Sequence, residues 1–126
     1  MLSSRNVMWM GMVAIIIIGL IHLAQASAEM AETRYLGLMF IANGIAAVVV
    51  AAGIYRGAAL WGWGLGALIA AGAFVGYVIS RTVGLPGMEV EQWLQPLGIL
   101  SLVVELIFMA LFVWARPMRR TVTASR

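Results

Sequence analysis

Apolar residues fill four long stretches of the chain, and polar residues gather in the short segments between them. The stretches cover residues 9–27, 35–55, 58–80 and 92–115. Each is long enough for an α-helix to cross a hydrocarbon core about 30 Å thick, and too long for a strand of a membrane barrel. Because backbone groups in lipid must be hydrogen-bonded within their own segment, we predict an all-α, integral membrane four-helix bundle.

The composition agrees with residence in a bilayer and leaves little length for anything else. Of the 126 residues, 63% are apolar and 10% are charged, and the mean hydropathy is +1.01. These values lie far from those of a soluble domain. Since four spans with short connections use up the chain, residues 1–126 are predicted to form a single transmembrane domain.

The first apolar stretch also has features of a cleavable signal peptide. Arg5 precedes it, and the small-residue triplets Ala24-Gln25-Ala26 and Ala26-Ser27-Ala28 match a cleavage-site pattern. However, the apolar run over 7–28 is longer than the usual signal-peptide core of about 7–15 residues. We therefore favour a retained first span that resembles an uncleaved signal anchor.

Charged residues differ between the connections and predict the orientation of the chain. Arginine dominates the N-terminal segment, the second connection and the C-terminal segment, at Arg5, Arg56, Arg116, Arg119, Arg120 and Arg126. The first and third connections carry mainly glutamate, at Glu29, Glu32, Glu89 and Glu91, against Arg34 and Arg81. Because positive residues stay on the inner side of the cell membrane, both termini are predicted to be cytoplasmic. This bias accounts for the pI of about 10.2 without nucleic-acid binding, and contact with anionic lipid is its more plausible extra role.

Several kinds of chemistry are excluded by the residues that the chain lacks. It contains no cysteine, no lysine and no aspartate, which rules out disulfides, thiolate metal sites, Schiff-base cofactors and a Ser-His-Asp triad. A single histidine, His22, cannot supply both axial ligands of a haem within one chain. Met8, Met10 and Met12 alternate and would splay apart on a helix, so copper binding there is not expected. The sequence requires no cofactor.

Small residues recur along the third stretch and predict a close helix contact. Gly62/Gly66 and Gly72/Gly76 have the spacing at which two membrane helices approach closely, and Tyr77 shares the stripe that begins at Gly62. Packing inside the bundle is the favoured interpretation. Contact in a homodimer or a larger membrane complex is the alternative.

A few polar side chains lie within the apolar stretches, where such groups are costly and tend to face a partner, a ligand or a cavity. They are His22, Asn43, Tyr77, Ser101 and Glu105. Counted from the outer ends of the spans, they fall in the outer half of the bilayer. We predict that they form an outward-facing polar site with Glu105 at its floor. Arg81 is expected to reach into this site from its outer rim.

The predicted site leaves its chemistry open. Imidazole, carboxylate and phenol groups together can pass a proton, bind a metal ion or hold the polar head of a ligand. If a metal binds, His22 and Glu105 are its expected ligands. The alternatives are that His22 is only hydrated near the interface, that Asn43 bonds between helices, and that a neutral Glu105 bonds to Ser101 or to a backbone carbonyl.

Three features together resemble a known group of proteins. His22 in the first stretch, the sequence YVISRTVGLPG after the third and Glu105 in the fourth are similar to features of small four-span bacterial membrane proteins. The resemblance implies the fold and residence in the membrane, and it assigns no functional residue.

The predicted function is that of a small, non-enzymatic protein of the cytoplasmic membrane, either an accessory subunit or a binding module for a hydrophobic ligand. No paired carboxylates or nucleophile–base motif for an enzyme can be found in the apolar stretches. The alternative is a proton-coupled small-molecule transporter that uses Glu105. A pH-dependent flux that is lost in Glu105→Gln would distinguish the transporter.

Overall fold

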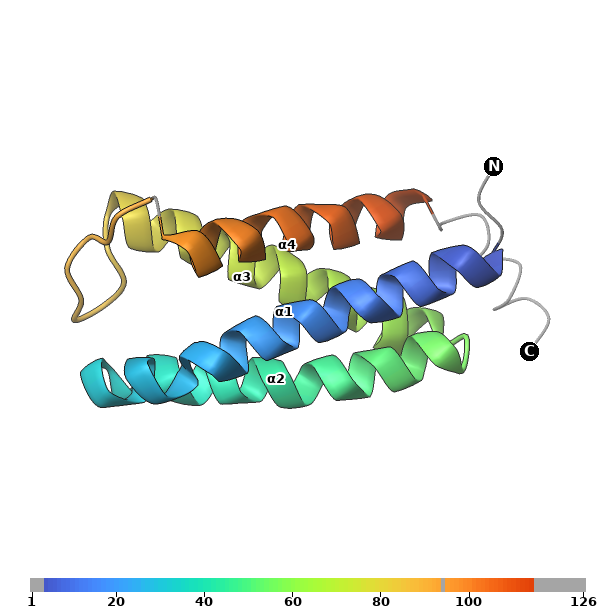
Figure 1. Cartoon of the computed structure of the whole chain (residues 1–126), viewed down its shortest axis with the longest axis horizontal. Helices are drawn as coiled ribbons and strands as arrows, with labels where there is room; N and C mark the ends of the chain where they lie inside the picture. The colour runs from blue at the N-terminus through green and yellow to red at the C-terminus, as the bar shows by residue number, and fades with distance from the viewer. Residues whose placement is uncertain (1–3, 94, 115–126) are drawn as a thin grey trace.

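A computed structural model describes residues 4–93 and 95–114 of the chain (Figure 1). The helices are α1 (Ser4–Glu32), α2 (Arg34–Tyr55), a short π-helix η1 (Ala59–Gly64) that leads directly into α3 (Leu65–Thr82), and α4 (Pro96–Trp114). No strand occurs in this part of the chain. Each of α1, α2, η1 with α3, and α4 is long and apolar enough to cross a membrane. The prediction of an all-helical chain with four such helices is confirmed.

Two helices differ in extent from the predicted stretches. α1 continues beyond both ends of 9–27, because the flanking residues include neither proline nor a run of glycines that would end a helix. α4 begins at Pro96 rather than at residue 92. Proline suits the first turn of a helix, where its missing N–H costs nothing, and it disfavours a helical conformation in the residue before it. Ala115 lies outside the described residues.

The helices form two antiparallel pairs, α1 with α2 and α3 with α4 (Figure 1). Glycines bring the backbones of the first pair close together at successive levels. A Cβ atom added at Gly19 would lie 2.5 Å from the Cβ atom of Ala47, and one added at Gly37 would lie 2.5 Å from the Cα atom of Met30. The first pair is therefore in close contact towards the end where α1 leads into α2 as well as in its middle.

The two pairs pack against each other at the end where α2 leads into η1. A Cβ atom added at Gly62 would lie 2.7 Å from the backbone carbon of Gly53, so these backbones are almost in direct contact. Beside them lies an apolar plug, by which we mean the buried side chains of Ile15, Ile18, Val50, Trp63 and Phe108. This plug fills the centre of the bundle over the half in which α1 begins and α4 ends.

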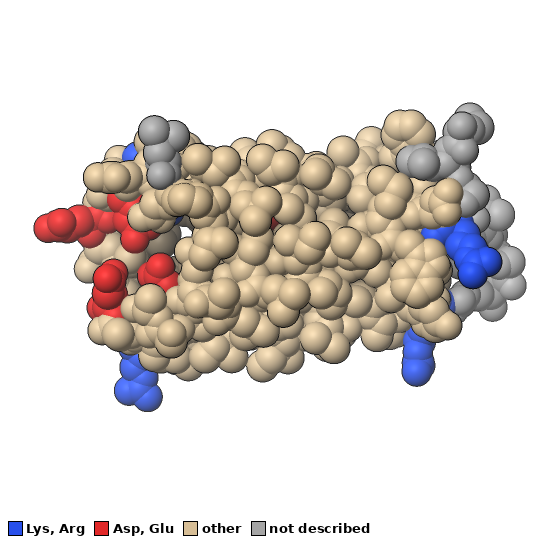
Figure 2. Space-filling model, viewed as in Figure 1, with Lys and Arg blue, Asp and Glu red and all other residues tan. Residues whose placement is uncertain are grey.

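Towards the opposite end the two pairs diverge (Figure 1). Figure 2 shows the surface hollowed there, beside a group of acidic side chains, and it shows arginine side chains at both ends of a long apolar body. The glycines of α3 reflect this change. Gly66 is enclosed by Phe108 and Val50, but a Cβ atom added at Gly72 or Gly76 would have no neighbour within 4 Å.

The predicted small-residue contacts are therefore divided between two environments. Gly62 and Gly66 pack inside the chain, against Gly53 and Phe108 respectively. Gly72 and Gly76 do not pack against another helix among the described residues. A contact with a second protein through that face stays a prediction.

Candidate functional site

The residues that face the centre of the bundle change from apolar to polar midway along it. On α1, the plug residues Ile15 and Ile18 are followed one turn later by His22. On α4, Glu105 and then Ser101 lie one and two turns from Phe108 towards the acidic end. His22, Ser101 and Glu105 are 8%, 6% and 1% exposed, so all three are buried polar groups.

Contacts with Gly66 allow the depth of these groups to be compared. A Cβ atom added at Gly66 would lie 2.5 Å from Phe108 and 2.9 Å from Val50, so these residues share one level across three helices. At about 1.5 Å per residue, Glu105 lies about 5 Å from that level towards the acidic end, and Asn43 lies about 10 Å from it. Glu105 is thus the deepest of the polar groups, directly next to the plug.

Only one of the two oxygens of the Glu105 carboxyl group has a hydrogen-bond partner among the described residues. The Ser101 hydroxyl donates a short hydrogen bond to Oε2 of Glu105. Oε1 is buried and has no hydrogen-bond partner among the residues that the structure describes. A buried oxygen left without a donor costs about 1–3 kcal/mol. Oε1 is therefore the atom at which a proton or a donor group of a ligand is expected.

His22 lies slightly nearer the acidic end than Glu105 does, and its side chain contacts residues other than Glu105. Its Nδ1 atom lies 2.8 Å from the carbonyl oxygen of Ile18. Because a carbonyl can only accept, Nδ1 carries a hydrogen, and Nε2 is an acceptor when the ring is neutral. The ring packs edge-on against Phe40, with centroids 4.8 Å apart. No hydrogen bond or ion pair joins His22 to Glu105 within the described ranges.

Two further oxygens of the polar half have no partner. The Oδ1 atom of Asn43 on α2 and the Oε2 atom of Glu29 on α1 are buried and accept no hydrogen bond in the part of the chain described. Asn43 Oδ1 therefore accepts no hydrogen bond from another helix within the described residues. Glu29 was not among the predicted site residues. It lies seven residues after His22, and this spacing places both on one side of a helix.

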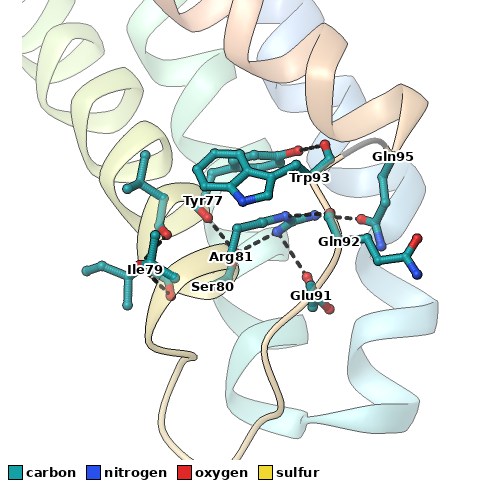
Figure 3. Close-up of polar contacts among 10 residues, drawn as sticks. Tyr77, Ile79, Ser80, Arg81, Glu91, Gln92, Trp93 and Gln95 are labelled. Carbon is teal, nitrogen blue, oxygen red and sulfur yellow. Dashed lines mark hydrogen bonds and ion pairs between the residues drawn. The ribbon is translucent and has the colours of Figure 1, made fainter.

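Arg81 and Tyr77, both predicted members of the site, instead hold the connection that follows α3 (Figure 3). The guanidinium group of Arg81 lies 3.8 Å from the centroid of the Tyr77 ring, and its Nη1 atom lies 2.9 Å from Oε2 of Glu91. Its remaining hydrogen bonds are to the Ser80 hydroxyl, the Gln92 carbonyl and the Gln95 side chain. We call this set of contacts the Arg81 hub. Sequence reasoning missed Ser80 and both glutamines.

Tyr77 fixes the same connection from the side of the bundle. Its hydroxyl donates to the Trp93 carbonyl over 2.5 Å, and the two rings pack edge to face. A Cβ atom added at Gly98 would lie 2.6 Å from the Tyr77 ring, so α4 approaches α3 closely here. The phenol is therefore already engaged in a structural contact and is not directed to Glu105.

The connection between α3 and α4, described over 83–93 and at 95, spans the diverging end of the bundle. It is attached to α3 by the Arg81 hub and by a hydrogen bond from the Glu91 N–H to the Ser80 carbonyl, 2.9 Å long. It is attached to the other helix pair by the Tyr35 hydroxyl, which donates to the Pro86 carbonyl over 2.6 Å. The connection thus links the two pairs where their helices are farthest apart.

The polar half can also be compared with the donor groups that a metal ion requires. No group of three or more histidine, cysteine, aspartate or glutamate side chains able to hold a metal ion occurs within residues 4–93 and 95–114. His22 and Glu105, the expected ligands, would supply two donors at most. What the polar half offers instead is a set of unpaired oxygens above an apolar floor.

Comparison of the chain with protein-family models, with curated proteins and with solved structures gives no match. The resemblance to small four-span bacterial membrane proteins stays a prediction. The function must therefore be argued from the geometry of the polar half.

Proposed function

We propose that this chain is a small, non-enzymatic protein of the cytoplasmic membrane that binds an amphiphilic molecule between its two helix pairs, with Glu105 as the polar anchor. The observation that carries this proposal is the Oε1 atom of Glu105. It is buried in a side chain only 1% exposed, it has no partner among the described residues, and it lies where the pairs begin to diverge. A ligand site typically combines apolar walls with a few such polar groups.

The apolar plug favours binding over transport. Passage of a polar solute through the other half of the bundle would require Trp63 and Phe108 to separate, although their rings pack 5.5 Å apart between centroids and Phe108 is fully buried. A molecule that enters from the acidic end would therefore stop at Glu105. In this proposal the site is a pocket that opens at the acidic end and is closed by the apolar plug at the other.

The proposed orientation places the acidic end outside the cell and both termini in the cytoplasm. Figure 2 shows arginine side chains at both ends of the bundle, whereas the cluster of acidic side chains lies at one end only, so the net charge is positive at the end of Arg5 and Arg56. Green fluorescent protein fused after Arg126 should fluoresce, and alkaline phosphatase fused there should be inactive. Alkaline phosphatase inserted after Met88 should be active. The opposite pattern at both places would overturn the orientation.

Access to Glu105 from the acidic end can be tested with single cysteines, because the natural chain contains none. Ser101→Cys should react with a charged, membrane-impermeant methanethiosulfonate reagent added to the outer side, and at least about tenfold more slowly when the reagent is inside. Leu106→Cys is the matched control, because Leu106 is 51% exposed on the outward face of the same helix and should meet lipid. Val50→Cys, within the plug, should be unreactive from either side.

The reactivities of these cysteines decide the proposal. If Ser101→Cys reacts no faster than Leu106→Cys, or reacts mainly from the cytoplasmic side, the polar half is not open to the outside and the proposed pocket does not exist.

A further inference from the structure

We infer that the ligand of this pocket is an organic cation with an N–H donor, such as a primary ammonium group on an apolar body. This inference rests on the proposed function and specifies the chemistry that the pocket accepts. It follows from which hydrogen-bonding groups of the polar half are already used and which are not.

The hydroxyl, imidazole and guanidinium donors of the polar half named below are used within the protein itself. The Ser101 hydroxyl donates to Glu105, and the Nδ1–H of His22 is directed to the carbonyl of Ile18. The Tyr77 hydroxyl donates to Trp93, and the Arg81 guanidinium is taken up by the hub. A ligand that needs donors, such as a carboxylate or a ketone, would find these groups already engaged.

The acceptors show the opposite pattern. The buried side-chain atoms without a hydrogen bond in the described part of the chain are all oxygens: Oε2 of Glu29, Oδ1 of Asn43 and Oε1 of Glu105. They come from three different helices, α1, α2 and α4. The neutral His22 ring adds Nε2 as a fourth acceptor. These atoms lie at different depths, and a group bound beside any one of them satisfies it by donating a hydrogen bond.

Charge points to the same class of ligand. The ion pair within the described ranges joins Arg81 to Glu91 at the mouth, so no cationic side chain contacts Glu105. Counted from Gly66, Arg81 lies about 20 Å along the bundle, whereas Glu105 lies about 5 Å along it. An ammonium group beside Glu105 would form a charge-assisted hydrogen bond, which is about twice as strong as a neutral one. An ionised Glu105 would repel an anion at the same position.

The inference can be tested with probes that share one decyl chain and differ only in the head group. Decylamine supplies charge and N–H donors at neutral pH, decyltrimethylammonium supplies charge alone, decanol supplies a donor alone, and decanoate is an anion. Saturable binding of each radiolabelled probe is measured by equilibrium dialysis against the full chain in nanodiscs of zwitterionic lipid. Empty nanodiscs give the partition into lipid.

Decylamine should bind one molecule per chain, at least about tenfold more tightly than decanol or decyltrimethylammonium, and decanoate should not bind saturably. Glu105→Gln should weaken decylamine binding by about tenfold or more. Glu89→Gln is the matched control, since it removes a charge of the same sign from the exposed connection and should leave the affinity unchanged.

The outcomes separate the two proposals. If decanol or decanoate binds best and its binding depends on Glu105, the cation is the wrong class although the pocket exists. If no probe shows saturable binding that depends on Glu105, the cation is again the wrong class. The reactivity of Ser101→Cys then decides whether the pocket itself fails as well.

Discussion

Gly62→Ala is expected to destabilise the bundle by about 1–3 kcal/mol, although it adds only one methyl group. That methyl group would lie 2.7 Å from the carbonyl carbon of Gly53 and 2.7 Å from the backbone nitrogen of Ile54. Both atoms belong to the backbone of α2, so no side chain can rotate away to make room. The two helix pairs would have to move apart where they are most tightly packed. Reversible unfolding in mixed detergent micelles, followed by circular dichroism, measures this loss.

Gly72→Ala and Gly76→Ala provide the comparison within the same helix. A Cβ atom at either position has no neighbour within 4 Å, so the added methyl group should be tolerated. Alanine also favours a helix over glycine by about 1 kcal/mol, so these variants should be as stable as the natural chain or slightly more stable. Equal stability of Gly62→Ala and Gly72→Ala would show that α2 and η1 do not approach as described.

The sequence predicts this helix contact only in part. The spacing of Gly62 and Gly66 indicates that another backbone or a large side chain comes close to the third span, because small residues leave room for one. It does not indicate which segment fills the room. Gly53 fills it beside Gly62, and Phe108 fills it beside Gly66. That choice depends on how four helices pack around one another, which no local pattern along a single helix determines.

For the candidate site too, the sequence predicts which residues take part but not which groups they contact. Glu105, Ser101 and His22 could be selected from the sequence because a polar residue in an apolar stretch must be buried among protein groups or face a cavity. The contacts of each side chain could not be predicted, because they depend on helix rotation. His22 is directed to its own helix and to Phe40 rather than to Glu105. Glu29 was missed because it lies close to the end of the apolar stretch, where a glutamate is usually exposed.

Arg81 shows a different limit of sequence reasoning. An arginine at the end of a span is typical of a side chain that extends to the interface. The structure instead encloses it, with its side chain only 7% exposed, because residues of the connection that follows α3 fold back over it. Glu91, Gln92 and Gln95 supply its partners. Such an enclosure by a later segment cannot be recognised from the arginine or its neighbours in sequence.

Arg81→Ala is expected to release the connection over 83–95 from the end of α3. The change removes the ion pair with Glu91, the hydrogen bonds to Ser80, Gln92 and Gln95, and the contact with the Tyr77 ring. Hydrogen bonds to a charged group contribute about 1.5–3 kcal/mol, reduced here because Glu91 is partly exposed to solvent. The N–H of Glu91, which is bonded to the Ser80 carbonyl, should therefore exchange its hydrogen about tenfold faster or more. Hydrogen exchange with mass spectrometry in nanodiscs measures this rate.

Two further variants show whether the planar guanidinium or the positive charge holds the connection. Arg81→Lys keeps the charge but cannot reach Glu91, Gln92 and Gln95 at once, so its exchange rate should fall between those of the natural chain and Arg81→Ala. Arg34→Ala removes an exposed positive charge from the same end of the bundle and should leave exchange over 83–95 unchanged. If Arg34→Ala has the same effect as Arg81→Ala, the connection responds to net charge at this end, and the Arg81 hub does not hold it.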